Sequence, residues 1–197
     1  MRDIDGIETV DAPRGWQGAT VTIDPFEDLR PNETWKGNGY RSRNEHPEHA
    51  YAFSDRRVHR VGDLDEEYPA LLARALPPGA QISLGAAGAT EFVVRGQLIQ
   101  STVSSNVRPV AAFFQVLGIP FAKHEVRFRV AVELYRDTSE APIWSQTYAY
   151  TDDQLQGIFY GSEDSGDLAK AALRDSVNRA AADITAVVAA SRSASGA

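Results

Sequence analysis

The sequence HEVRFRVAVELYR, which spans residues 124–136, determines most of what this chain can fold into. Its apolar side chains fall on every second residue, and charged or small residues stand between them. These apolar residues are Val126, Phe128, Val130, Val132 and Leu134. Strict alternation over this length predicts a strand that has one face in a core and the other in water.

A second alternating stretch follows a turn-rich connection at residues 136–142. Residues 143–151 place mainly aromatic side chains on one face. The residues of this face are Trp144, Gln146, Tyr148 and Tyr150. The two stretches together predict an antiparallel hairpin.

Further strands are predicted upstream of this hairpin. Residues 19–24 and 90–103 alternate clearly, and weaker patterns at 58–61 and 80–84 are consistent with short strands. Gly96 interrupts the alternation of residues 90–103 and indicates either a bulge or a close neighbour of the strand.

Two segments have helical spacing. Asp63 followed by Glu66 has the pattern of a capping box, and Pro77-Pro78-Gly79 ends the helix that it begins. A long Ala-rich helix begins at Ser165. Several strands with two separated helices predict an α+β fold, namely a largely antiparallel sheet with two helices packed on one face.

The length of 197 residues corresponds to a single domain. We expect residues 1–18 to form an N-terminal arm and residues 19–190 to form one α+β domain. Residues 191–197 are small and polar, and we expect them to fray as a C-terminal tail.

Composition excludes several classes of function. The net charge of −7 argues against a nucleic-acid surface, and the acidic residues among the arginines of residues 41–60 weaken a local basic patch. The absence of Cys excludes disulfides and thiolate chemistry. No stretch has the roughly 20 consecutive apolar residues of a membrane-spanning helix. The first residues have no basic and apolar regions typical of a signal peptide.

The connection between the two central strands is unusually apolar. Its sequence, VAAFFQVLGIPFA, occupies residues 110–122 and is called the apolar insertion below. Hairpin connections are normally two to five residues long. One interpretation is that the insertion covers the core. The other is that it contacts a partner or a membrane through exposed apolar side chains. The candidate contact residues are Phe113, Phe114, Leu117, Ile119 and Phe121.

A weak metal-binding pattern lies in the stretch 31–62. His46, His49 and His59 provide imidazoles within a short length of chain, and imidazole is a common ligand of Zn²⁺. Pro47 rules out the helical H-E-x-x-H arrangement. A solvated polar loop explains the same residues, so both interpretations stay open.

No catalytic motif is present in the sequence. It lacks G-x-S-x-G, the P-loop and G-x-G-x-x-G, and no nucleophile and base stand in a recognisable pattern. Asp28 and Arg30 follow the first strand and are expected to form an internal ion pair. We therefore expect no enzymatic activity and no cofactor.

Several short motifs resemble those of small bacterial envelope lipoproteins. PFEDLR at residues 25–30 resembles their "PF-x-D-x-R" turn, and EFVVRGQL at 91–98 resembles their "y-v-l-x-G-x-l" strand. Residues 130–144 resemble their second hairpin, which ends in Trp. The C-terminal Ala-rich helix also fits, so the likeness extends over about residues 19–190.

This resemblance implies an α+β domain akin to those of outer-membrane assembly and transport-auxiliary lipoproteins. It implies a non-enzymatic adaptor or accessory role on the periplasmic side of the outer membrane. An envelope protein or a membrane surface would then be the partner, and self-association is left open. Such proteins carry a lipidated Cys after a signal peptide, and we expect both to precede this sequence. The alternative is a small-ligand or metal-binding module that uses residues 31–62.

Overall fold

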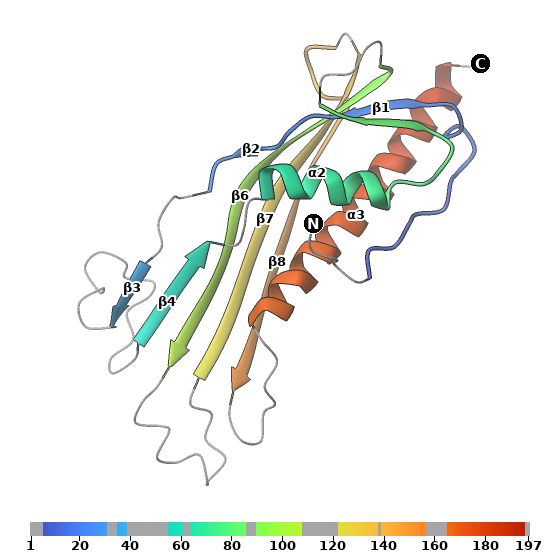
Figure 1. Ribbon diagram of the computed structural model, residues 1–197. Coiled ribbons are helices and arrows are strands. Elements are labelled where there is room, and N and C mark those ends of the chain that lie inside the picture. The colour runs from blue at the N-terminus through green and yellow to red at the C-terminus, as the bar shows by residue number, and fades with distance from the viewer. Residues whose placement is uncertain are drawn as a thin grey trace.

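The computed structural model describes residues 6–30, 35–38, 55–60, 64–85, 90–107, 122–137, 139–156 and 165–195. Within these ranges the chain forms one mixed sheet and two helices (Figure 1). In chain order the elements are β1 (Thr20–Ile23), β2 (Glu27–Asp28), β3 (Trp35–Asn38), β4 (Asp55–Arg60), α2 (Leu64–Ala75), β5 (Gln81–Leu84), β6 (Phe92–Val107), β7 (Ala122–Arg136), β8 (Trp144–Gln156) and α3 (Ser165–Ser195).

Strand β6 is the centre of the sheet. It pairs along its length with β7, which pairs with β8, and all of these pairings are antiparallel. On its other side β6 pairs in parallel with β1 at its beginning and antiparallel with β4 at its end. The predicted hairpin is confirmed, because Phe128 lies opposite Tyr150 and Val130 lies opposite Tyr148.

The expected α+β class is confirmed, and both helices pack on one face of the largely antiparallel sheet (Figure 1). The parallel pairs are confined to the short strands β1, β2 and β5. Parallel neighbours need a crossover connection, and α2 lies in the chain between β1 and β5. No helix in the described part of the chain is long and apolar enough to cross a bilayer.

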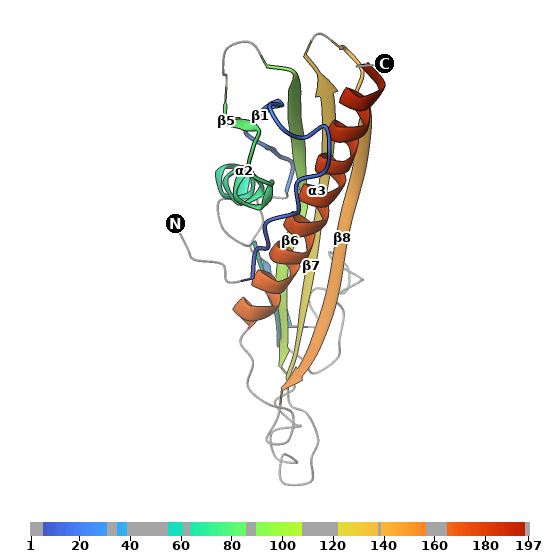
Figure 2. The same ribbon diagram turned by 90° about the vertical axis from the view of Figure 1, so that its right-hand side faces the viewer.

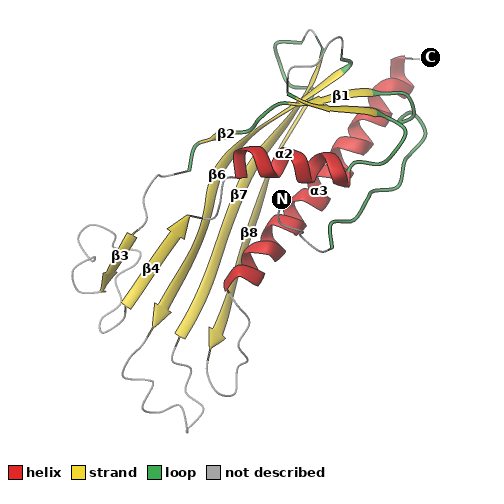
Figure 3. Cartoon of the chain, viewed as in Figure 1, coloured by secondary structure: helices red, strands yellow, loops and turns green. Residues whose placement is uncertain are grey.

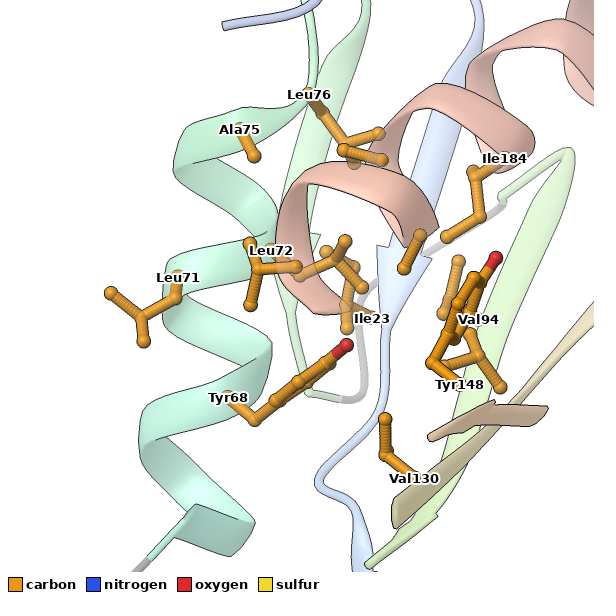
Figure 4. Packing of buried hydrophobic residues seen from close by; sticks show 14 of the residues in the cluster. Ile23, Tyr68, Leu71, Leu72, Ala75, Leu76, Val94, Val130, Tyr148 and Ile184 are labelled. Carbon is orange, nitrogen blue, oxygen red and sulfur yellow. The ribbon is translucent and has the colours of Figure 1, made fainter. Parts of the chain in front are cut away.

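The core lies between the helices and the sheet residues that they cover, which we call the helix-covered half. Figure 4 shows Tyr68 and Leu72 of α2 beside Ile23, with Tyr148 and Ile184 farther along the same cluster. Removing this apolar surface from water is the main stabilising contribution to the fold. The predicted core faces of β6 and β7 are buried, including Phe92, Val94, Leu98, Val126, Phe128, Val130, Val132 and Leu134.

Residues 6–18 lie against the rest of the domain. Trp16 is fully buried, and its indole N–H donates to the carbonyl oxygen of Pro77 at 2.9 Å. The guanidinium of Arg192 donates to the carbonyl oxygens of Gly15 and Gln17 at 2.9 and 2.6 Å. The division into arm, domain and tail stays a prediction, but α3 continues to Ser195, into the segment expected to fray.

Candidate functional site at the far end of the sheet

One row of residues closes the sheet at the end away from β1 and β5. Asn38 is opposite Asp55, Asp55 is opposite Val107, Val107 is opposite Ala122, and Ala122 is opposite Gln156. We call this row the far end. Figure 3 shows β3, β4, β6, β7 and β8 reaching it, beyond the part of the sheet that α2 and α3 cover.

Three connections leave the sheet from this single row. They are residues 39–54 between β3 and β4, residues 108–121 between β6 and β7, and residues 157–164 between β8 and α3. The apolar insertion and the connection that contains His46 and His49 therefore begin and end at the same end of the molecule, whereas His59 lies within β4. Sequence alone does not show this, because it depends on the strand order.

The predicted contact residues lie outside the described part of the chain. They are Phe113, Phe114, Leu117, Ile119 and Phe121. The described strand residues on either side of them, Val107 and Ala122, form the last pair of β6 and β7. The contact role of the insertion stays a prediction.

The predicted metal ligands are only partly described. His46 and His49 lie outside the described ranges, whereas His59 lies in β4 opposite Val103. Within the residues that the structure describes, no group of three or more His, Cys, Asp or Glu is placed to hold a metal ion. Metal or small-ligand binding by residues 31–62 stays a prediction. Calorimetric titration with Zn²⁺ at neutral pH tests the metal version, and the absence of binding heat would contradict it.

The described residues near the far end carry paired charges. Lys123 and Asp153 form a 2.9 Å ion pair between β7 and β8. The Tyr150 hydroxyl donates to Asp152 at 3.0 Å, and partial burial together with this carboxylate acceptor raises the pKa of Tyr150. These contacts stiffen the edge of the sheet but do not form a site for acid–base chemistry.

Residues 25–30, the motif that resembles the lipoprotein turn, pack closely against β6 and α2. The ring of Phe26 lies over Gly96. Its centroid is 5.1 Å from the centroid of the Tyr68 ring. A Cβ at Gly96 would overlap the Phe26 ring, so the close neighbour expected from this glycine is confirmed. The bulge lies slightly farther along β6, between Leu98 and Gln100.

The same motif provides the expected ion pair. The Arg30 guanidinium is almost completely buried and donates twice to the Asp28 carboxylate at 2.9 Å. The Asp28 carboxylate also accepts the backbone N–H of Arg30 at 3.0 Å. Because Asp28 pairs with Leu98 in the sheet, this ion pair fixes the turn that holds β2 against β6. Its role is structural, and it leaves no open carboxylate for chemistry.

Two buried tyrosines, Tyr68 and Tyr148, lie in the helix-covered half, and the sequence pattern placed Tyr148 on the aromatic face of its strand. Burial raises the pKa of Tyr68 well above its ordinary value. Burial, reinforced by the Asp183 carboxylate that accepts its hydroxyl at 2.7 Å, does the same to the pKa of Tyr148. Both therefore keep their protons at neutral pH and act as structural groups.

An open polar groove lies between the N-terminal segment, β8 and α3. It has a volume of about 490 Å³, and its lining includes Glu8, Tyr150, Arg174, Asn178 and Arg179. Charges of both signs line it, and Arg179 also forms an ion pair with Asp175 at 3.4 Å. This arrangement favours no single class of ligand. Sequence could not indicate the groove, because residues far apart in the chain form it.

Comparison with known proteins supports the fold. No family model matches the chain, and no curated protein matches it in sequence. A Xanthomonas campestris protein of the family model DUF330 aligns with a TM-score of 0.51 at 8% identity, over 95% of this chain and 94% of that chain. At this identity the likeness shows the fold alone.

Two weaker likenesses involve other bacterial proteins. A PelC dodecamer from Paraburkholderia phytofirmans aligns with a TM-score of 0.40 at 12% identity, over 86% of this chain and 91% of that chain. A lipoprotein from Neisseria meningitidis aligns with a TM-score of 0.30 at 12% identity, over 83% of this chain and 98% of that chain. Membership of the lipoprotein group suggested by the short motifs stays a prediction.

Proposed function

We propose that this protein is a non-enzymatic component of the bacterial cell envelope that acts as an adaptor or as an assembly or transport accessory. The apolar insertion is its contact surface, and its partner is an envelope protein or the membrane surface. The periplasmic side of the outer membrane is the proposed location. The motif resemblance and the shared α+β fold support the class of protein, and the topology of the sheet supports the surface.

The single observation that carries the proposal is where the insertion joins the sheet. Among the residues of β7 whose burial is described, the buried apolar residue nearest to the far end is Val126, and the strand continues for four more residues to Ala122. At about 3.4 Å per residue, the end of the insertion lies roughly 14 Å beyond that core residue. This separation favours the contact interpretation over the interpretation that the insertion covers the core.

The physical reason is the chemistry of the segment. Three Phe within residues 110–122 are unusual in a connection between strands, and the described strand residues beside them include the Lys123–Asp153 ion pair as well as Leu155, which is 40% exposed. An apolar segment beside a polar rim is typical of an interaction surface. The net charge of −7 disfavours a strongly anionic surface as the partner.

The test replaces the apolar side chains without touching the described core. We expect Phe113→Ser, Phe114→Ser and Leu117→Ser together to abolish binding to vesicles of zwitterionic phosphatidylcholine or capture of a cross-linked envelope partner. We expect the melting temperature to stay nearly the same. Flotation with vesicles, cross-linking in cells and thermal unfolding are the three measurements.

The matched control removes exposed apolar surface elsewhere. Leu29 and Leu84 are 50% and 56% exposed, and Leu29→Ser with Leu84→Ser should leave binding unchanged. A large drop in melting temperature for the triple variant would show that the insertion belongs to the core. Equal binding by the triple variant and the wild type would also contradict the proposal.

A further inference from the structure

Strand β8 forms one margin of the sheet. It has 13 residues, and among the described strands it pairs only with β7 (Figure 2). No described residue outside β7 makes a backbone hydrogen bond to β8. A long strand margin presents a row of N–H and C=O groups that can pair with another chain.

Most of this margin lacks the features that usually prevent such pairing. Charged side chains and Pro are the common protections, and residues 143–151 contain neither. The side chains on its water-facing side are small and exposed, namely Ser145, Thr147, Ala149 and Thr151. Such features flank the stretch, at Pro142 on one side and at Asp152 and Asp153 on the other, where the Asp153 N–H donates to the Asp152 carboxylate at 2.8 Å.

We propose that the β8 margin binds the β8 margin of a second copy of this chain, antiparallel and centred on Thr147. In this register Ser145 lies opposite Ala149, and Ile143 lies opposite Thr151. The uncharged stretch 143–151 then pairs with itself, and no like charges face each other.

The lengths of the other margins favour this occupant. The opposite side of the sheet ends in β3 at one end and in β5 at the other, and each has only four residues. Neither can match the uncharged length of β8, whereas a second β8 matches it completely. A self-complementary margin gives a closed two-fold dimer and not an open filament.

The dimer has a definite geometry. Antiparallel pairing about a two-fold axis perpendicular to the sheet joins the two sheets and keeps both helix layers on one side. The two far ends then point in opposite directions, so each copy presents its apolar insertion at its own end. The dimer and the proposed contact surface are therefore separate and can be tested separately.

The first experiment uses the absence of Cys from the chain. In the proposed register the two Thr147 residues face each other at the two-fold axis, with Cα atoms about 4.5–5.5 Å apart. This distance suits a disulfide. We expect Thr147→Cys to form a covalent dimer under mild oxidation, seen on a non-reducing gel.

Its control lies on the same face of the sheet, one strand inward. Ala131 of β7 is opposite Thr147, so Ala131→Cys should stay monomeric under the same oxidation. A mixture of Ser145→Cys and Ala149→Cys chains should cross-link more than either chain alone. Cross-linking of Thr147→Cys no greater than that of Ala131→Cys would overturn the proposal.

The second experiment measures association without a cross-link. Thr147→Lys places two like charges at the axis and should raise the dimer dissociation constant at least about tenfold in sedimentation equilibrium. Ala131→Lys should leave that constant unchanged. A wild-type chain that is monomeric at the highest concentration tested, or a Thr147→Lys chain that dimerises equally well, would overturn the proposal and leave a strand from another protein as the occupant.

Discussion

The helix-covered half and the far end are built from the same long strands but differ in what holds them. In the helix-covered half, the inner faces of β6 and β7 are apolar and buried beneath α2 and α3. Near the far end the described side chains are mostly polar and include the ion pairs Lys123–Asp153 and Arg127–Glu125, of which the first is largely exposed. The difference teaches that one set of strands can hold a stabilising core at one position and the proposed contact surface at another. Substitutions should then lower stability in the first region and change binding in the second.

The largest effect on stability is expected at the joint between β2 and β6. Gly96→Ala forces the Phe26 ring away from its position against Tyr68, and such overpacking costs about 3 kcal/mol of unfolding free energy. Urea denaturation measures this loss. Adding Phe26→Leu should recover part of it, and a double variant without recovery would place the strain elsewhere.

High pH is expected to weaken the helix-covered half. The folded chain keeps the proton of Tyr68 because burial raises its pKa, whereas the unfolded chain loses it near pH 10. The unfolded state then binds fewer protons, so the contribution of Tyr68 is intact below about pH 10 and the free energy of unfolding falls above it. At about pH 11 the loss is about 1.4 kcal/mol for this one group. Urea denaturation at a pH below 10 and at about pH 11 is the measurement. Between these two conditions the free energy of unfolding should fall less for Tyr68→Phe than for the wild type.

The two buried tyrosines should differ at neutral pH. The Tyr148 hydroxyl donates to Asp183, so Tyr148→Phe should cost about 1 kcal/mol of unfolding free energy. The Tyr68 hydroxyl is buried and has no partner within hydrogen-bond geometry among the described residues, because the nearby Ser176 hydroxyl donates to the Leu173 carbonyl oxygen at 2.8 Å. Tyr68→Phe should therefore cost less than Tyr148→Phe. Thermal unfolding of the two variants side by side makes the comparison. Equal losses would mean that the hydrogen bond to Asp183 contributes nothing.

The smallest effect is expected near the far end. The side chains of Lys123 and Asp153 are 44% and 53% exposed, and Lys123→Ala should change the free energy of unfolding by less than about 0.5 kcal/mol. Chemical denaturation at low and high salt is the measurement. A loss comparable to that of Gly96→Ala would remove the contrast between the two regions.

Patterns that repeat within a few residues predicted most elements correctly. The alternation at 124–136 and 143–151 gave the hairpin, and Pro77-Pro78-Gly79 marked the end of α2. Gly79 has a φ of 99°, a backbone conformation that favours glycine. The ion pair between Asp28 and Arg30 was also correct, because only Leu29 separates its members.

Features that join distant residues were missed. Trp16 belongs to the core although the surrounding residues 1–18 are polar, because its indole N–H donates to the carbonyl oxygen of Pro77. In addition, Arg192 of α3 holds the carbonyl oxygens of Gly15 and Gln17 on either side of it. The pairing of β3 with β4 and the common row at the far end were not foreseen, since short strands have weak patterns. For the candidate site, sequence named the segments, and the strand order placed their beginnings and ends together.

By itself, the amino-acid sequence determined the hydrophobic periodicity of the strands and helices, the ends that Pro and Gly give them, and the presence of an unusually apolar connection. These properties depend on side-chain direction along a regular backbone, which is a local matter. Only the tertiary structure decided that Phe26 meets Gly96, that β1 pairs in parallel with β5 and β6, and that β8 is left as a margin. Such choices depend on which packing of distant segments buries the most apolar surface while pairing the backbone, and no short window of sequence contains that comparison.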